Sequence, residues 1–320
     1  MKLLVLAKVP DDMKDIAKTM AESIGMQAIF EEDNDDWKDV EAIISFIPKL
    51  KTMNSYISKL PKLKLIQTLS AGVDLLDFNQ IPDNITVCSN AGAFALPVAE
   101  HAVSMAMALS KNLLSNHMKM KNGVFDQRSP SVKLEGKMAG ILGYGGIGRE
   151  IGRLCRGIGM ELQVISRKPV DEKVHFSGTM DSLDQVLESS DFIFISLPLN
   201  RYTRNLITTK ELKKMKANAI LVNVARAAIV NEENLYNHLR ENPEFRAGID
   251  VWWEEPITTG KYEMKYPFLD LPNVIGSPHN SGIIPEIDIN AFMSAVKNVE
   301  LWMKTGKPRN IVRREDYRQV

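Results

Sequence analysis

The glycine-rich turn GYGGIG at 143–148 constrains the fold of this chain more than any other segment. The apolar run MAGILGY leads into it, a helical pattern over 147–158 follows, and the apolar run ELQVIS closes a strand–helix–strand unit. In that context G-x-G-x-x-G is typical of a turn that binds a dinucleotide pyrophosphate at a helix N-terminus. Gly143 would allow the tight turn, Gly145 the close approach of the backbone, and Gly148 the contact between helix and strand. A purely structural glycine turn is the alternative interpretation.

The end of the next predicted strand bears on which dinucleotide is bound. Ser166-Arg167-Lys168 stand where NAD-selective folds place a carboxylate that accepts the ribose hydroxyls. Arg can hold a 2′-phosphate through two hydrogen bonds and Lys adds a point charge, so we predict a preference for NADP(H), with NAD(H) as the second option. Two alternatives stay open. Asp171 could fold back toward the ribose, and the two basic residues could be ordinary surface charges.

The length and charge of the chain narrow its class. At roughly 150 residues per domain, 320 residues predict about two domains. Lys+Arg and Asp+Glu both number 40, and a net charge of zero argues against a dedicated nucleic-acid binder. Without a signal peptide or an uncharged apolar run of about 18–20 residues, we expect a cytoplasmic protein with no membrane partner. Two cysteines, Cys88 and Cys155, are too few for a four-thiolate metal site, and we predict no metal.

Two successive arrays of apolar runs predict the architecture. The first has strands at 2–9, 27–30, 42–47, 63–69 and 85–90, with a helix over 11–25. The second begins near 138 and continues through DFIFISLP, AILVNVA, AGIDVW and NVIGSP to a last helix that stops at Gly306. The runs do not alternate strictly, as expected of parallel sheets covered on both faces. We therefore predict the α/β class with two doubly wound, Rossmann-like and flavodoxin-like domains.

The segment after Pro97, VAEHAVSMAMALSKNLL, is apolar on nearly every helical face. Such a helix is buried all round, so we expect it between domains or in an oligomer interface, and we predict a homodimer. His101 and His117 fall in or just beyond this helix, and we assign them no chemical role. The acidic run 31–36 is interpreted as a solvated loop rather than a cation site, because like charges repel.

Three polar residues follow predicted strands at their carboxyl ends. Arg226 comes after ILVNVA, Glu255 after AGIDVWW, and His279 after NVIGSP. In doubly wound folds ligands bind outside these strand ends, so the three residues should converge beside the cofactor. Arg offers a permanent cationic fork for a carboxylate, and His is an acid and base near neutral pH. Glu paired to the second ring nitrogen would orient the imidazole.

With these residues in place, the sequence resembles the D-isomer-specific 2-hydroxyacid dehydrogenases over nearly its whole length. The stretches that support the resemblance are Ser70-Ala71-Gly72-Val73-Asp74, Val98-Ala99-Glu100-His101, 143–148, Leu197-Pro198-Leu199 with Thr203, Val222-Asn223-Val224-Ala225-Arg226, Asp250-Val251 through Glu255-Pro256, and Ser277-Pro278-His279.

The resemblance implies roles and domain bounds. Arg226 would bind the substrate carboxylate and C2 oxygen, His279 would be the proton donor and acceptor, and Glu255 rather than Glu254 its partner. Two further sets follow. The loop of Ser70, Ala71, Gly72 and Val73 would bind the carboxylate, and the cofactor would contact Gly143, Tyr144, Gly145, Gly146, Ile147, Gly148, Ser166, Arg167, Lys168, Leu197, Pro198, Thr203, Val224, Ala225, Arg226, Asp250, His279, Ser281 and Gly282. The substrate domain would comprise 1–98 plus 283–320, the dinucleotide-binding domain 99–282, and the active site would lie in the cleft between them.

We therefore expect hydride transfer between NAD(P)H and a small 2-keto acid, giving a D-2-hydroxy acid. Glyoxylate, hydroxypyruvate and longer 2-keto acids are the candidate substrates. Ala227, Ala228, Asn231, Trp252-Trp253 and Asn280 depart from the usual family residues and affect the expected pocket shape. Glu255 stands where formate dehydrogenases usually have Gln, which disfavours that activity. A phosphoglycerate dehydrogenase and a co-repressor-like protein that senses dinucleotides without turnover are the alternatives.

Overall fold

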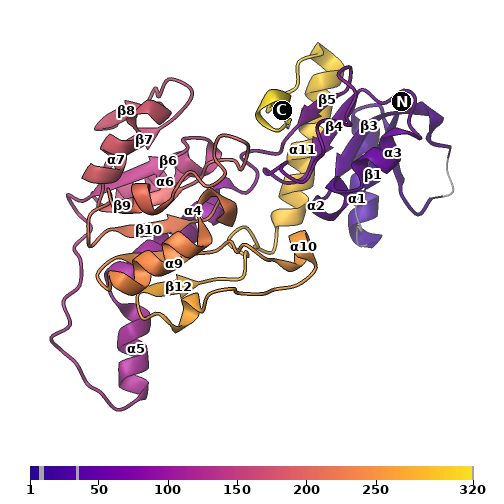
Figure 1. Cartoon of the computed structure of the whole chain (residues 1–320). Coiled ribbons are helices and arrows are strands. Elements are labelled where there is room, and N and C mark those ends of the chain that lie inside the picture. The colour runs from indigo at the N-terminus through magenta and orange to yellow at the C-terminus, as the bar shows by residue number, and fades with distance from the viewer. Residues whose placement is uncertain (7–10, 34–35, 319–320) are drawn as a thin grey trace. The chain divides into compact units, whose positions relative to one another are not determined.

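The structure of the chain is a computed structural model that describes residues 1–6, 11–33 and 36–318 (Figure 1). The predicted strand over 2–9 and the acidic run over 31–36 therefore extend in part outside the described residues. The chain divides into two compact units. The first is Met1–Phe94 with Ile284–Val320, and the second is Ala95–Ile283.

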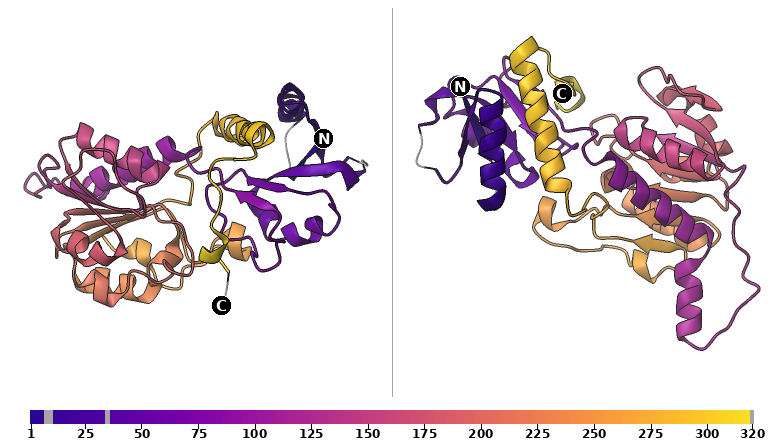
Figure 2. Two further views of the ribbon diagram at one scale, coloured as in Figure 1. Left: turned by 90° about the horizontal axis from the view of Figure 1, so that it is seen from above. Right: turned by 180° about the vertical axis from the view of Figure 1, so that it is seen from behind.

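The first unit is built on a five-stranded parallel sheet with the strand order β2-β1-β3-β4-β5, the order of flavodoxin-like folds. Its strands are β1 (Lys2–Leu6), β2 (Gln27–Phe30), β3 (Val40–Ser45), β4 (Leu65–Thr68) and β5 (Thr86–Cys88). Helices α1 (Asp11–Ser23) and α11 (Ile287–Thr305) pack on one face, and the short α2 (Ile47–Leu50) and α3 (Met53–Ile57) lie on the other (Figure 2).

Strand β1 shows why its sequence lacks polar alternation. Successive side chains of a strand point to opposite faces, so Leu3 and Val5 enter the cluster under α1 and α11, whereas Leu4 and Leu6 enter the cluster on the opposite face. All four side chains are fully buried. A strand covered on both faces needs apolar residues at every position. β1 pairs in parallel with β2 and β3, which confirms the predicted parallel arrangement.

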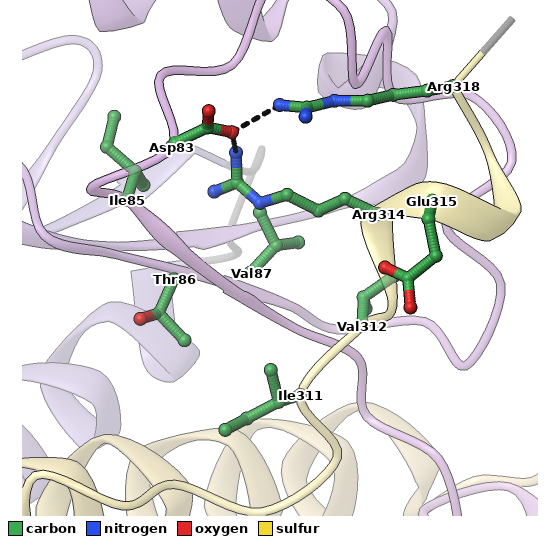
Figure 3. A pocket seen from close by; sticks show the side chains of 9 residues that line it. All are labelled: Asp83, Ile85, Thr86, Val87, Ile311, Val312, Arg314, Glu315 and Arg318. Atoms are coloured by element: carbon green, nitrogen blue, oxygen red, sulfur yellow. Dashed lines mark hydrogen bonds and ion pairs between the residues drawn. The ribbon is translucent and has the colours of Figure 1, made fainter. Parts of the chain in front are cut away.

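The C-terminal segment returns to β5 and completes the first unit (Figure 3). Ile311 forms an antiparallel bridge with Cys88, and the Val312 amide donates to the Val87 carbonyl at 2.9 Å. Arg314 donates to the backbone carbonyl of Pro82 at 2.9 Å, and Arg318 pairs with Asp83. The segment and β5 line a cavity of about 370 Å³. These contacts attach the last described residues to the sheet edge.

The second unit contains a seven-stranded parallel sheet in the order β12-β11-β10-β9-β6-β7-β8. The strands are β6 (Met138–Leu142), β7 (Glu161–Ile165), β8 (Phe176–Gly178), β9 (Phe192–Ile195), β10 (Ile220–Asn223), β11 (Arg246–Ile249) and β12 (Val274–Gly276). Figure 2 shows helices α4 (Ala95–Ser110) and α6 (Gly146–Gly157) on one face, and α7 (Leu183–Ser189) and α9 (Glu232–Glu241) on the other. The sequence did not predict β8, because a three-residue edge strand contains no apolar run of its own.

The described residues also form several shorter elements. They are the helices α5 (Leu113–Lys121), α8 (Thr209–Leu212) and α10 (Pro256–Thr259), and 3₁₀ turns at Trp37–Asp39, Met180–Ser182, Ala227–Ile229, Phe268–Asp270 and Arg314–Asp316. None of the helices in the described part of the chain is both long and apolar enough to cross a membrane.

Helix α4 differs in its bounds from the helix predicted after Pro97. It begins at Ala95, two residues before Pro97, and ends at Ser110 rather than continuing to Leu114. Asn112 adopts a left-handed conformation with φ of 52° and separates α4 from α5. The helix is apolar because it packs within its own unit, against α6 and strands β10, β11 and β12. Its composition therefore needs neither a domain boundary nor a subunit interface as an explanation.

Strand β6 lies where the strand order of the second sheet reverses, between β9 and β7. All pairings of this sheet are parallel, so the carboxyl ends of its strands share one edge. Ligands of doubly wound folds bind at such an edge, beside the reversal point. Figure 1 shows α6 starting directly after β6, so the glycine-rich turn stands at this position.

Candidate active site

The glycine-rich turn has the geometry of an anion-binding helix start. Gly143 has φ of 96°, and a Cβ there would stand 2.9 Å from the backbone of Ser196 and Leu197. A Cβ at Gly148 would stand 2.0 Å from the Gly143 carbonyl oxygen, so helix and turn meet at a distance that only glycine permits. Gly145 caps α6 without a side-chain hydrogen bond, and no atom lies within 4 Å of the place a Cβ would take. That open space and the unsatisfied first-turn amides fit a pyrophosphate.

The segment after β7 is attached to α6 by a carboxylate that the sequence analysis missed. Glu172 accepts hydrogen bonds from Arg149 Nη1 and Arg156 Nη2, both at 2.7 Å, and from the Tyr144 hydroxyl at 2.8 Å. These bonds, led by that from Arg156, lower the pKa of Glu172 to about 2. The sequence analysis considered the adjacent residue Asp171 instead. The sequence does not distinguish the two carboxylates, because the basic residues that contact Glu172 come close to it only in the fold.

Arg167 and Lys168 are exposed at the carboxyl end of β7, and the Lys168 amide donates to Ser166 Oγ at 3.2 Å. The structure therefore places these three residues at the expected edge. Their contact with a 2′-phosphate stays a prediction.

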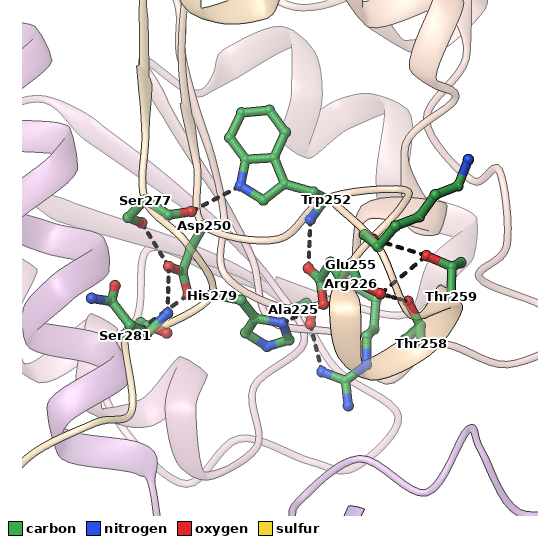
Figure 4. A network of polar contacts seen from close by, with 12 residues as sticks. Ala225, Arg226, Asp250, Trp252, Glu255, Thr258, Thr259, Ser277, His279 and Ser281 are labelled. Carbon is green, nitrogen blue, oxygen red and sulfur yellow. Dashed lines mark hydrogen bonds and ion pairs between the residues drawn. The ribbon is translucent and has the colours of Figure 1, made fainter. Parts of the chain in front are cut away.

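Glu255 and His279 form a hydrogen-bonded pair. His279 Nδ1 lies 2.7 Å from Glu255 Oε2, and Glu255 Oε1 accepts the Trp252 amide at 2.7 Å (Figure 4). The Glu255 side chain is 9% exposed, whereas the His279 side chain is 34% exposed. Glu254 instead contacts Lys261. A buried carboxylate fixed at both oxygens can hold an imidazole in one orientation.

His279 sits in a constrained turn. Its φ is 52°, in the left-handed region that non-glycine residues rarely adopt. The His279 amide donates to the Asp250 carbonyl at 2.8 Å, and the Asp250 carboxylate accepts the amides of Asn280 at 3.2 Å and Ser281 at 3.4 Å. Asp250 is fully buried. Asp250 therefore holds the turn that presents the imidazole, a function that the sequence analysis did not assign to it. Its contact with the cofactor stays a prediction.

Arg226 follows β10, the neighbour of β11 in the sheet. Its Nη1 donates to the Ala225 carbonyl at 2.8 Å. Asn223 shapes this segment, because its side chain accepts the Ala225 amide at 3.1 Å and donates to the Arg226 carbonyl at 3.0 Å. Asn223 pairs in register with Ile249, and Ile249 with Gly276, so the strands leading to Arg226, Glu255 and His279 end at one level of the sheet.

The other predicted cofactor residues lie in segments that follow strands of the same sheet. Thr203 is buried and donates to the Pro198 carbonyl at 2.6 Å, which fixes the loop after β9. The remaining members are Leu197 and Pro198 after β9, Val224 and Ala225 after β10, and Ser281 and Gly282 after β12. Their contacts with a cofactor stay predictions.

The loop Ser70–Val73 belongs to the first unit, unlike the catalytic candidates. Ser70 Oγ donates to the Gly72 carbonyl at 2.7 Å, and Thr68 Oγ1 donates to the Ser70 carbonyl at 2.6 Å. Val73 is buried, whereas Ala71 and Gly72 are half-buried. The loop is thus held by its own hydrogen bonds, and its contact with a substrate carboxylate stays a prediction.

The site also contains two polar residues that the sequence analysis did not assign to it, Ser277 and His101. Ser277 Oγ donates to Asp250 Oδ1 at 2.6 Å and lies 2.9 Å from His101 Nε2 on α4. His101 therefore belongs to the hydrogen-bond network behind the His279 turn. In the sequence, its place in the segment VAEH was the feature that could have indicated this role. In the described part of the chain, no group of three or more His, Cys, Asp or Glu residues could hold a metal ion.

Comparison with known proteins identifies the family. The model of the D-isomer-specific 2-hydroxyacid dehydrogenase NAD-binding domain matches residues 103–281, more than half of the chain. The chain belongs to this family. The chain is 31% identical over 279 residues to a glycerate dehydrogenase from Methylorubrum extorquens, a match that covers 85% of each protein.

Two further relatives match this chain, one in its crystal structure and one over part of a longer sequence. The crystal structure of a protein from Pyrobaculum aerophilum, provisionally assigned as a formate dehydrogenase, matches with a TM-score of 0.85 and 30% identity, over 99% of this chain and 100% of that one. A D-3-phosphoglycerate dehydrogenase from Methanocaldococcus jannaschii is 29% identical over 82% of this chain, but the match spans only 50% of that longer protein. The family thus confirms a nicotinamide-dinucleotide-binding oxidoreductase with two parallel-sheet α/β units.

Proposed function

We propose that this protein reduces a small 2-keto acid to the D-2-hydroxy acid, with NADPH as the preferred cofactor. The observation that most supports the proposal is the His279–Glu255 pair at 2.7 Å, on a turn at the same sheet edge as Arg226 and the glycine-rich turn. A pair of this kind performs general acid–base chemistry, and the cationic fork suits a carboxylate.

His279 would act as the general acid. Its Nδ1 is engaged by Glu255, so Nε2 is the ring nitrogen that exchanges a proton with the substrate. In reduction, Nε2–H gives its proton to the C2 oxygen as the carbonyl becomes a hydroxyl, and Glu255 holds the ring so that Nε2 faces the substrate. Oxidation reverses the transfer, with neutral His279 as the base.

Arg226 would bind the substrate carboxylate and polarise the C2 carbonyl. Negative charge develops on the C2 oxygen during reduction, and a permanent cation beside it lowers the barrier by about 3–4 kcal/mol. The amides of the Ser70–Val73 loop would add hydrogen bonds to the carboxylate. The first turn of α6, from Gly145 onward, would hold the pyrophosphate, and the bound dihydronicotinamide would supply the hydride.

A panel of 2-keto acids tests the proposal. With NADPH and glyoxylate, hydroxypyruvate, phosphohydroxypyruvate and longer 2-keto acids, we expect cofactor oxidation with at least one member and a D-configured product by chiral chromatography. Tight cofactor binding without turnover across the panel would contradict the proposal and favour a dinucleotide sensor. Turnover confined to phosphohydroxypyruvate would favour a phosphoglycerate dehydrogenase.

The cofactor preference predicts a selective effect of the basic residues after β7. Lys168→Ala or Arg167→Ala should lower kcat/KM for NADPH by about tenfold and leave that for NADH within about twofold, because only NADPH has the 2′-phosphate. Arg153→Ala is the matched control, since Arg153 is an exposed cation on α6 that pairs with Glu150. If the unchanged protein uses NADH as well as or better than NADPH, the preference is refuted.

We also propose a homodimer, supported by helix α5 and the segment that follows it. No residue of α5 is buried, yet the region exposes six apolar side chains. They are Leu113, Leu114, Met118, Met120, Val124 and Phe125. Six exposed apolar side chains within one short segment are more typical of an interface than of a solvated helix.

The dimer proposal predicts different effects for two equally exposed apolar residues. Leu113 is 58% exposed on α5 and Ile311 is 57% exposed in the first unit. Leu113→Ser should weaken self-association by at least about tenfold in sedimentation equilibrium, because it removes apolar area from the proposed interface. Ile311→Ser should leave self-association unchanged. A monomer at micromolar concentration for the unchanged protein would refute the proposal.

A further inference from the structure

Trp252 connects the two segments that hold the proposed catalytic pair. Its backbone amide donates to Glu255 Oε1 at 2.7 Å, and its indole Nε1 donates to the backbone carbonyl of Ser277 at 2.8 Å. Ser277 lies two residues before His279. Figure 4 shows both hydrogen bonds leaving the same residue. One residue therefore bonds to the partner of the imidazole and to the strand end that bears the imidazole.

The indole ring is held tightly in this place. Trp252 is 7% exposed, and a Cβ at Gly276 would stand 2.7 Å from its Cζ2 atom. The ring also makes edge contacts with Tyr262 and Phe268, at centroid distances of 6.1 and 6.3 Å. Gly276 ends β12, so the ring lies directly against the strand that leads to His279. A ring confined in this way fixes the direction of its N–H group.

We propose that Trp252 is a positioning residue that sets the distance between Glu255 and His279. The inference deepens the proposed function and rests on it for its catalytic consequence. Glu255 and His279 follow different strands, β11 and β12, and the left-handed turn at His279 must be held from outside. Proton transfer depends on placement within about 0.5 Å, so loss of the Trp252 link should affect the chemical step more than substrate binding.

The neighbouring Trp253 provides a matched control. Its indole Nε1 also donates to a backbone carbonyl, that of Val230, at 2.9 Å, and its ring stacks on Phe268 at 5.3 Å. Both residues thus lose the same kind of hydrogen bond when replaced by Phe. Only the bond of Trp252 reaches the segment before His279.

The first measurement is steady-state kinetics of 2-keto acid reduction. Trp252→Phe should lower kcat about tenfold and leave KM for the keto acid within about twofold, the loss expected from one buried hydrogen bond at the chemical step. Trp253→Phe, which changes a side chain packed on Phe268 and bonded to Val230, should leave kcat within about twofold. The methyl group added by Gly276→Ala would meet the Trp252 ring and the Leu269 side chain, each at 2.7 Å. This variant should displace the Trp252 ring without altering it and reproduce the loss of kcat, and it serves if Trp252→Phe fails to fold. Equal effects of Trp252→Phe and Trp253→Phe would overturn the inference.

The second measurement needs no turnover. Hydrogen–deuterium exchange of the amides over 277–282 should be at least about tenfold faster in Trp252→Phe than in Trp253→Phe, because the turn loses its attachment. If the unchanged protein reduces no 2-keto acid, the proposed function fails, while faster exchange would still support the positioning of the turn by Trp252. Unchanged exchange in Trp252→Phe would overturn that positioning, whatever the activity.

Discussion

Replacing His279 with Ala is expected to lower kcat/KM for 2-keto acid reduction by at least about 10²-fold, the usual contribution of a general acid. The variant removes the ring whose Nδ1 is held by Glu255 and leaves no other imidazole in that turn. Initial rates of NADPH oxidation at saturating cofactor measure the effect. Cofactor affinity, followed by fluorescence titration, should change far less, because the glycine-rich turn stays intact.

The histidine prediction has a matched control and a graded companion. His175→Ala removes an exposed histidine that also pairs with a glutamate, Glu161, and should leave kcat/KM unchanged. Glu255→Gln keeps a side chain of the same shape but removes its charge, and it should lower kcat by about tenfold because the carboxylate that holds the His279 ring through Nδ1 is lost. Near-normal turnover in His279→Ala would contradict the assignment of the proton donor.

Replacing Arg226 should produce a loss of similar size by a different route. Arg226→Ala removes the cation at the C2 oxygen, and we expect kcat/KM to fall by at least about 10²-fold, in line with about 3–4 kcal/mol of lost transition-state stabilisation. Arg226→Lys keeps the charge but loses the planar fork, so it should recover only part of the activity. Steady-state kinetics with the best substrate of the panel measures both variants.

The kinetic pattern separates Arg226 from His279. KM for the keto acid should rise in Arg226→Ala, because the carboxylate loses its counter-charge, whereas loss of His279 should act mainly on kcat. Arg240→Ala, at an exposed position on α9, is the control and should behave like the unchanged protein. An unchanged KM and kcat in Arg226→Ala would exclude Arg226 from substrate binding.

Local patterns in the sequence were sufficient to predict most strands and the glycine turn. Apolar runs without alternation predicted strands covered on both faces, and Leu3, Leu4, Val5 and Leu6 occupy the two faces of β1 as that requires. The glycines at 143–148 predicted the turn because their spacing is dictated by backbone contacts a few residues apart. Pattern analysis placed the end of α4 too late, at Leu114 rather than Ser110, and missed the three-residue strand β8.

The sequence by itself determined the strands other than β8, the glycine turn and the identity of the catalytic candidates, because each depends on neighbours in the chain or on residue chemistry. Only the tertiary structure decided which side chains support them. Glu172 joins Arg149 and Arg156, and His101 reaches Ser277 across 176 positions. Trp252 bonds to Ser277 across 25 positions. Such contacts depend on strand order and register, which bring distant segments to one sheet edge and leave no periodic trace in the sequence.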